Sequence, residues 1–229
     1  MASPLAVIVT AHNEADRLPA TLAALARAFG GAPVWVADDA STDATARVAR
    51  DAGAHLVSTA RRTGKGQAAT LAARRLLEQE LTPPAVVLLC DGDLGDSAEL
   101  LVALTEPVGA GELDLAVAMF SRRRGGGLGV AVGFARIALR RLCGLELKAP
   151  ISGQRAVRGD ALGALLPFAA RFGMEMGMTV DAVRAGLRLG EVEVALVHRA
   201  TGPSPAGFLH RGRQLADFLV VYLDRRTRQ

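Results

Sequence analysis

Residues 86–96, VVLLCDGDLGD, run from a stretch of apolar residues directly into three carboxylates. The apolar part has the length and composition of a buried strand. Asp91, Asp93 and Asp96 would repel one another unless a positive charge lies among them, and a divalent cation is one source of that charge. A solvated turn that leads into a helix N-terminus is the alternative explanation.

Strand patterns alternate with helical patterns around this stretch. Strands are predicted at 5–11, 34–38, 55–59, 85–91 and 113–120, and helices are predicted to begin near residues 14, 42 and 66. Such alternation favours an α/β domain with a largely parallel sheet that is covered on both faces. Ligands of such sheets bind at the carboxyl ends of the strands, so the polar residues there are the candidate site.

The second half of the chain has a different pattern. A Gly/Arg stretch, SRRRGGGLG, occupies residues 121–129, and the next segment has apolar residues at helical spacing with arginines beside them. Further on, the sequence predicts a helix at 175–186, a strand at 188–199 and a final amphipathic helix at 205–225. No internal repeat or linker divides the chain, which predicts one domain over residues 1–229.

The composition excludes several classes of protein. Half of the 229 residues are hydrophobic, which excludes a disordered chain, and the apolar runs are shorter than a membrane span needs. The formal net charge is +4, but only Lys65 and Lys148 among the 27 basic residues are lysines, so the charge reflects an arginine bias. With no aromatic residues interleaved for base stacking, we expect no nucleic-acid partner. Two cysteines without disulfide or zinc spacing and a start without a signal peptide favour a cytoplasmic protein.

Three further motifs follow predicted strands or open predicted helices. ADDASTDAT at 37–45 places Asp38 and Asp39 at a strand end, with Ser41 able to cap the next helix. RTGKGQAAT at 62–70 places Lys65 between glycines at a helix start, without the spacing of a P-loop. VALVHRATG at 194–202 ends a strand in His198 and Arg199.

A metal hypothesis follows from the residue types. Mg²⁺ or Mn²⁺ takes one or two carboxylates and completes its octahedron with water and substrate phosphates. Asp93 is the first choice of ligand, Asp91 is a ligand or lies behind the ligands, and Asp96 belongs to the helix N-terminus. A lone histidine is more often structural, but His198 becomes a third ligand if its strand returns to the same edge of the sheet as Asp93.

Four motifs, taken together in this order, resemble those of the GT-A nucleotide-diphosphosugar glycosyltransferases of family 2: VIVTAHNE, DDASTD, GKG and DGD. The resemblance implies a metal-dependent glycosyltransferase with a single Rossmann-like GT-A domain and a mixed, mostly parallel sheet. Residues 1–120 would bind the nucleotide-sugar and residues 121–229 the acceptor. The implied nucleotide-sugar residues are Ala11, Asn13, Glu14, Asp38, Asp39, Lys65, Asp91, Gly92, Arg122, Arg124 and Arg199. The resemblance further implies that Glu14 contacts the ribose, that Asp39 or its neighbour Asp38 accepts from the base, and that Lys65 lies beside base and ribose.

Two subfamilies compete for the acceptor half. SRRRGGGLG and APISGQRAVRG resemble the polyprenyl-phosphate enzymes of the dolichol-phosphate mannose synthase type, which implies acceptor contacts from Ser152, Gly153, Gln154 and Arg155. FGMEMGMTVDA followed by HRATG resembles glucosyl-3-phosphoglycerate synthase, which implies that Glu175 lies near the sugar and acceptor and that His198 completes the metal site. A polyprenyl-phosphate acceptor is favoured, and a small phosphoglycerate-type acid is the alternative.

The expected mechanism differs with the acceptor. Asp93 serves catalysis through the metal, and Glu175 is the candidate base if the acceptor is a hydroxyl, whereas a phosphate acceptor needs no base. Contact with the inner face of a membrane through the two amphipathic helices, and a homodimer, both stay open. A nucleotidyltransferase and an inactive nucleotide-sugar-binding protein are the remaining alternatives.

Overall fold

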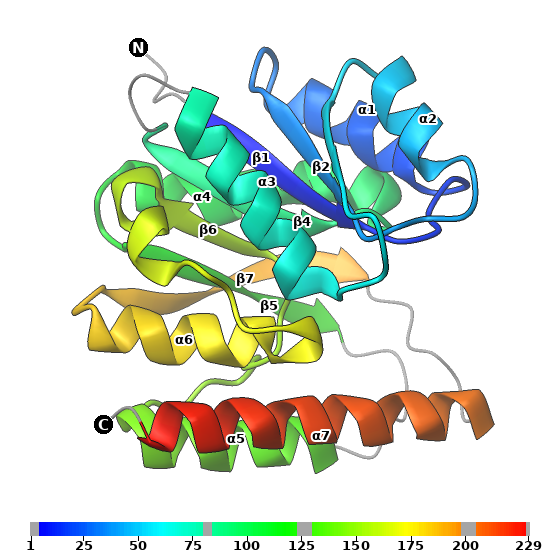
Figure 1. Cartoon of the computed structure of the whole chain (residues 1–229). Coiled ribbons are helices and arrows are strands. Elements are labelled where there is room, and N and C mark those ends of the chain that lie inside the picture. Colours follow the sequence, from blue (N-terminus) through cyan, green and yellow to red (C-terminus); the bar gives the residue numbers. More distant parts are fainter. Residues whose placement is uncertain (1–4, 80–83, 123–129, 198–204, 228–229) are drawn as a thin grey trace.

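A seven-stranded sheet in the order β3-β2-β1-β4-β6-β5-β7 forms the centre of the protein (Figure 1). The structure, a computed structural model, describes residues 5–79, 84–122, 130–197 and 205–227. The strands are β1 (Leu5–Ala11), β2 (Val34–Asp38), β3 (His55–Ser58), β4 (Val86–Asp91), β5 (Leu115–Arg122), β6 (Arg155–Arg158) and β7 (Leu189–Val197). Only β6 is antiparallel to its neighbours among these strands. The predicted α/β fold with a mixed, mostly parallel sheet is therefore confirmed.

Helices cover both faces of this sheet. One face packs against α1 (Leu18–Ala28), α2 (Thr45–Asp51), the 3-10 helix η1 (Gly95–Leu101) and α4 (Val102–Gly109). The other face packs against α3 (Lys65–Gln79), α6 (Met174–Arg184) and the 3-10 helix η2 (Gly159–Leu165). The 3-10 helix η3 (Arg171–Gly173) contacts α3 and α7. The alternation of strand side chains explains the two cores, since Val7 and Val9 enter the first and Ala6 and Ile8 enter the second.

Two predicted helix starts are too early. The helices begin at Leu18 and Thr45, where the sequence predicted starts near residues 14 and 42. Asn13 and Ala40 have φ angles of 57° and 55°, in the left-handed region that an α-helix does not use. The residues that follow β1 and β2 therefore form turns before the helices begin.

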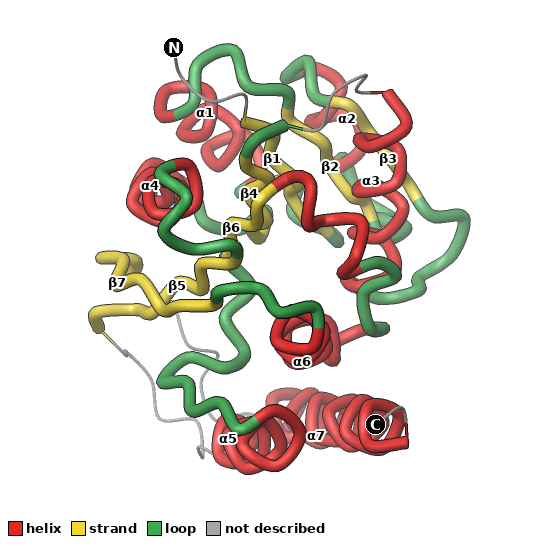
Figure 2. The backbone as a smooth tube through the Cα atoms, turned by 90° about the vertical axis from the view of Figure 1, so that its left-hand side faces the viewer, coloured by secondary structure: helices red, strands yellow, loops and turns green. Residues whose placement is uncertain are grey.

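A further pair of helices forms an outer layer. Helices α5 (Val130–Cys143) and α7 (Pro205–Thr227) lie side by side beyond α6, as both views show (Figures 1 and 2). Helix α6 is apolar on two sides: Met174 and Met178 join the sheet core, whereas Met176 and Val180 join a third core with α5 and α7. None of the helices in the described ranges is long and apolar enough to cross a membrane.

Close backbone packing fixes α7 against the start of α6. A Cβ atom added at Gly173 would lie 2.3 Å from Cγ2 of Val221, and one added at Gly177 would lie 3.7 Å from Cγ1 of the same side chain. At the other end of the seam, Nη2 of the buried Arg225 lies 2.7 Å from Oδ2 of Asp181. The amphipathic C-terminal helix is therefore an integral layer of the fold.

Candidate active site

Three strand ends and one strand start meet at one edge of the sheet. In the register of the strands, Thr10 lies beside Asp91 and Ala11 lies beside Asp38, so the carboxyl ends of β1, β2 and β4 are adjacent. Because β6 runs in the opposite direction, its amino end reaches the same edge. This brings the segment before β6 to the acidic motif after β4, which the sequence alone did not predict.

Asp91 is surrounded by donors. Its carboxylate lies 2.6 Å from Nζ of Lys65 and accepts hydrogen bonds of 2.8 Å from Nε2 of Gln154 and 3.2 Å from the hydroxyl of Thr10. Burial opposes ionisation, but the charge of Lys65 and these hydrogen bonds outweigh it and hold the pKa of Asp91 below its usual value. Asp91 is therefore a carboxylate with a cation already beside it.

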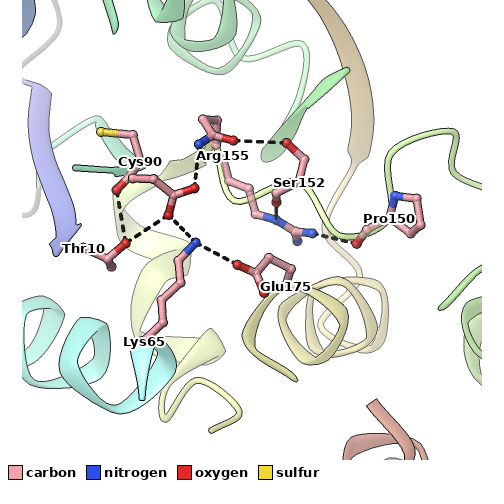
Figure 3. Close-up of polar contacts among 9 residues, drawn as sticks. Thr10, Lys65, Cys90, Pro150, Ser152, Arg155 and Glu175 are labelled. Carbon is pink, nitrogen blue, oxygen red and sulfur yellow. Dashed lines mark hydrogen bonds and ion pairs between the residues drawn. The ribbon is translucent and has the colours of Figure 1, made fainter. Parts of the chain in front are cut away.

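Lys65 joins this carboxylate to a second one. Its Nζ donates to Oε1 of Glu175 at 2.8 Å, and Figure 3 shows the lysine reaching from the start of α3 towards the start of α6. Burial disfavours the ammonium, but the two carboxylates more than compensate and raise the pKa of Lys65. The three side chains form one charged cluster, in which Glu175 is only 9% exposed.

The segment before β6 closes over this cluster. A Cβ atom at Gly153 would lie 2.5 Å from Nζ of Lys65 and 2.6 Å from Oδ2 of Asp91, so the cluster occupies the place of a side chain. The next residue, Gln154, is buried, and its amide oxygen lies 3.5 Å from the hydroxyl of Ser152.

Arg155 anchors the same segment from within the protein. Its guanidinium donates to the carbonyls of Ser152 and Pro150 at 3.0 and 3.2 Å and to the hydroxyl of Thr179 at 2.9 Å. Burial lowers the pKa of Arg155 to about 10, although the charge of Glu175 acts in the opposite direction. The residue is 1% exposed, so its surroundings fit a structural task, and contact with an acceptor anion stays a prediction.

Asp93, the second acid of the DGD motif, lies beside Arg17. Its side chain is 36% exposed and lies 3.5 Å from Nη1 of Arg17. Nearby, burial and the charges of Asp93 and Asp91 raise the pKa of Glu14, although Arg17 acts in the opposite direction. Negative charge therefore accumulates at this edge of the sheet. Carboxylate oxygens are the ligand atoms that Mg²⁺ and Mn²⁺ prefer.

These residues fit a metal that is bound partly by substrate. Within the described part of the chain, no three His, Cys, Asp or Glu side chains form a ligand group. An ion that takes one or two carboxylates and completes its shell with phosphate oxygens does not need such a group. Asp93, with Asp91 behind it, would hold the ion.

The turns after β1 and β2 are bound to each other. The amide of Asn13 donates to the hydroxyl of Ser41 at 2.9 Å, and its side-chain oxygen accepts from the amide of Thr42 at 2.8 Å. The amide of Glu14 donates to the hydroxyl of Thr45 at 2.8 Å. These contacts bring the predicted nucleoside residues Asn13 and Glu14 beside the turn that follows Asp38.

Asp38 and Asp39 hold loops. Asp38 accepts hydrogen bonds of 3.1 Å from the amide of Ser41 and from the hydroxyl of Ser58, and the Ser41 hydroxyl also donates to it. The prediction that Ser41 caps the next helix is wrong, because α2 begins only at Thr45. Asp39 accepts four hydrogen bonds from Thr59, Thr63 and Gly64, and contact with a base stays a prediction for both acids.

The remaining predicted residues divide into placed and unplaced ones. Ala11 is buried, and the amide of Gly92 donates to the Thr10 carbonyl, so both residues lie at the ends of the adjacent strands β1 and β4. Asp96 lies in the first turn of η1, as predicted, and pairs with Arg27 at 3.0 Å. The backbone of Arg122 pairs with Val197 at the end of β5, but nothing is described of its side chain, and Arg124, His198 and Arg199 lie outside the described residues.

The strand that leads to His198 has the required direction. β6 is antiparallel to both β4 and β5, so β4 and β5 run in the same direction, and β7 is parallel to β5. The strands β4, β5 and β7 therefore end at the same edge of the sheet. The last described residue of β7, Val197, therefore lies at the edge that carries Asp91. Coordination by His198 stays a prediction.

Sequence reasoning missed Thr10 and Arg17 as members of the site. Thr10 is the one hydroxyl in the apolar strand LAVIVTA, which is a usable signal for a polar contact at the strand end. Arg17 carries no comparable signal, because it is one of many arginines and its contact with Asp93 depends on the turn after β1.

The chain is similar to several known glycosyltransferases. Residues 6–142 match the family model of glycosyl transferase family 2. An undecaprenyl-phosphate mannosyltransferase of Micrococcus luteus is 32% identical over 213 residues, covering 86% of this chain and 85% of that protein. Glycosyltransferase AglJ of Haloferax volcanii is 30% identical over 205 residues, covering 86% of this chain and 64% of that protein.

Solved structures of glucosyl-3-phosphoglycerate synthase from Mycobacterium tuberculosis are also similar. One with phosphoglyceric acid has a TM-score of 0.75 and 26% identity, over 97% of this chain and 80% of that one. Another contains Mn²⁺, uridine-diphosphate-glucose and phosphoglyceric acid, and has a TM-score of 0.76 and 25% identity over 97% and 79% of the two chains.

Proposed function

The chain belongs to glycosyl transferase family 2, and we propose that it uses Mg²⁺ or Mn²⁺ to transfer a sugar from a UDP- or GDP-sugar to a polyprenyl phosphate. The observation that carries the donor assignment is the convergence of Glu14, Asp91 and Asp93 at one strand edge. Residues 1–120 would bind the donor, with Glu14 on the ribose, and residues 121–229 would bind the acceptor.

The metal would neutralise charge that develops on the departing diphosphate. Asp93, with Asp91 and His198, would hold it, and Arg122, Arg124 and Arg199 would add positive charge around the phosphates. A similar structure that contains Mn²⁺ and uridine-diphosphate-glucose supports this part of the proposal. A phosphate acceptor is already ionised, so Glu175 would then orient hydroxyl groups of the sugar and would not need to remove a proton.

The outer layer supports a lipid acceptor. Helix α7 exposes Leu219, Val220 and Leu223 by 47%, 65% and 51%, and α5 exposes Ile137 by 46%. On α5, the exposed Arg140 and Arg141 follow Ile137 by three and four positions, and so lie near it on the helix surface. An apolar helix face with flanking arginines suits the surface of an anionic bilayer, where a polyprenyl phosphate is found. The protein would bind peripherally, at the inner face of the membrane.

A small soluble acceptor is the second candidate. The structural similarity to a synthase that was crystallised with phosphoglyceric acid favours it. In this case Glu175 would act as the base that removes a proton from the acceptor hydroxyl.

Donor binding is tested by the melting temperature in the presence of UDP- and GDP-sugars with Mn²⁺. Ligands that bind the native state raise it, and we expect an increase with one nucleotide series. The Asp93→Asn variant should lose the metal-dependent part of this increase. Asp96→Asn is the matched control, because the Asp96 side chain is 86% exposed and pairs with Arg27. An unchanged melting temperature with every donor would refute the donor assignment.

The acceptor is tested by offering labelled donor to a polyprenyl phosphate and, separately, to 3-phosphoglycerate. We expect label in the lipid, and label in 3-phosphoglycerate alone would establish the soluble alternative. Binding to vesicles with anionic lipid should weaken in Val220→Glu and not in Leu100→Glu, which changes a side chain 42% exposed on η1. If the α7 variant instead changes only the molar mass in solution, the face is a homodimer interface.

A further inference from the structure

We infer that Lys65 is a positioning residue for sugar transfer, which fixes Glu175 on the acceptor side against Asp91 on the donor side. The inference rests on the proposed function, because it assigns Lys65 a task within that reaction. It differs from the role that the resemblance implies, in which Lys65 lies beside the base and ribose. The two roles predict different losses when the lysine is replaced.

The contacts of the ammonium carry the inference. Nζ lies 2.6 Å from Oδ1 of Asp91 and 2.8 Å from Oε1 of Glu175, and the two carboxylates belong to β4 and α6. The side chains of Lys65, Asp91 and Glu175 are 22%, 33% and 9% exposed, so solvent screens the cluster only partly. Without the cation between them, the two carboxylates would repel each other.

The backbone around the lysine is held on both sides. Gly64 has a φ of +96°, and its amide donates to Asp39 at 2.8 Å. On the other side, a Cβ atom at Gly66 would lie 1.8 Å from the carbonyl oxygen of Ala169, so α3 approaches that backbone as closely as a glycine permits. Lys65 therefore extends from a fixed point towards the two carboxylates.

Glu175 is held from its other side by a second cation. Thr179 accepts a hydrogen bond of 2.9 Å from Arg155 and donates one of 3.0 Å to the backbone carbonyl of Glu175. The buried guanidinium thus supports the backbone of Glu175 through Thr179, and Lys65 fixes its side chain. The position of this carboxylate is determined by both cations.

The cluster fits a lysine and leaves little room for an arginine. A Cβ atom at Gly153 would lie 2.5 Å from Nζ, so the ammonium fills the space beneath this glycine. A guanidinium is larger and planar, whereas an ammonium is a compact point charge. The arginine bias of the chain makes a lysine at this position more informative, since Lys148 is the one other lysine among the 27 basic residues.

The kinetic test separates positioning from donor binding. We expect Lys65→Met to lower kcat by about 100-fold while the Kd for UDP with Mn²⁺ changes by less than about 3-fold. Lys65→Arg should fail to restore kcat, and Lys148→Met should behave as the wild type. A 10-fold weaker Kd for UDP at unchanged kcat would show that Lys65 binds the donor and would overturn the inference.

A double-mutant cycle identifies the partner through which Lys65 acts. If Lys65 acts through Glu175, then Lys65→Met should cause no further loss of kcat in a Glu175→Gln background. Losses that add would overturn the inference. Should Lys65→Met unfold, Lys65→Gln applies the same test, because its amide removes the positive charge and keeps a polar group beside the two carboxylates.

An NMR measurement tests the contact without any assay of activity. With only two lysines in the chain, a ¹⁵Nζ spectrum has few signals to assign. The Lys65 signal should move in Asp91→Asn and in Glu175→Gln, and it should stay in place in Glu78→Gln, whose carboxylate pairs with Arg75. A Lys65 signal that is unmoved by Glu175→Gln would disprove the contact. A wild type that binds no donor would instead refute the proposed function and leave this spectrum as the test of the geometry.

Discussion

The carboxylate of Asp39 accepts a hydrogen bond of 2.8 Å from the backbone amide of Gly64, at the end of the loop between β3 and α3. Its other oxygen accepts from the amide and the hydroxyl of Thr63 at 2.7 and 3.0 Å. Asp39 is buried, and Lys65 follows Gly64 directly. Asp39, the second acid of the DDASTD motif, therefore fixes the backbone just before Lys65, the lysine of the GKG motif.

Asp39→Asn should destabilise the protein and displace this loop. An amide nitrogen in place of one carboxylate oxygen cannot accept from Gly64, and an unpaired buried amide costs about 1–3 kcal/mol. Urea unfolding should report a loss of this size, and the melting temperature should fall. Glu106→Gln on α4 is the control, because Glu106 is exposed. Equal stability of the two variants would contradict the structural role of Asp39.

Two glycine substitutions in helices should have opposite effects. Gly66→Ala would place a Cβ atom 1.8 Å from the carbonyl oxygen of Ala169, whereas Gly133→Ala on α5 meets no atom within 4 Å. We expect Gly66→Ala to cost about 3 kcal/mol or more, since backbone must move. Gly133→Ala should stabilise by about 0.5–1 kcal/mol through helix propensity. Thermal unfolding of both variants checks the pair, and a harmless Gly66→Ala would show that α3 lies farther from residue 169.

Asp114 lies at the edge of the sheet opposite the site, and its ionisation should make the stability of the protein depend on pH in the acid range. Hydrogen bonds from Arg188 and the charge of Arg158 lower the pKa of Asp114 to about 2. Because the pKa in the folded state is below the unfolded value of about 3.9, this contribution is present above about pH 4 and is lost as the pH falls towards 2.

Asp114→Asn should therefore cost about 1–2 kcal/mol at neutral pH and progressively less below about pH 4. Solvent weakens these ion pairs, since the side chains of Arg158 and Arg188 are 40% and 55% exposed. Urea unfolding across this pH range checks it, with the exposed Asp51→Asn as the control. A difference that stays constant with pH would rule out the titration of Asp114 as its source.

The sequence predicted the strands well because their apolar runs end in polar residues. The stretch 86–91 is β4 itself, and the strand predicted at 34–38 is β2. The start of α2 was missed because the left-handed Ala40 is not visible in a sequence pattern. The strand β6 was not predicted at all, because a segment of four residues with alternating Arg carries too short a pattern to indicate a strand or its direction.

The acidic cluster was predicted in part. Asp91 and Asp93 were correctly placed at a strand end, but the contacts of Asp91 with Lys65 and Gln154 join residues that lie far apart in the chain. Arg155 shows the limit most clearly. An arginine beside a site is usually interpreted as an anion binder, and its complete burial depends on α6 and on the turn at Pro150.

The outer layer of α5 and α7 has a consequence for how the protein opens. Its core is separate from the two cores that line the sheet, and α6 lies between them. A cooperative unit with its own core can open while the rest stays folded. Native-state hydrogen exchange should therefore find amides of α5 and α7 that exchange at a lower opening free energy than amides of β1 and β4. The layer of α5 and α7 would then be a separate foldon, which can loosen while the central sheet keeps its hydrogen bonds.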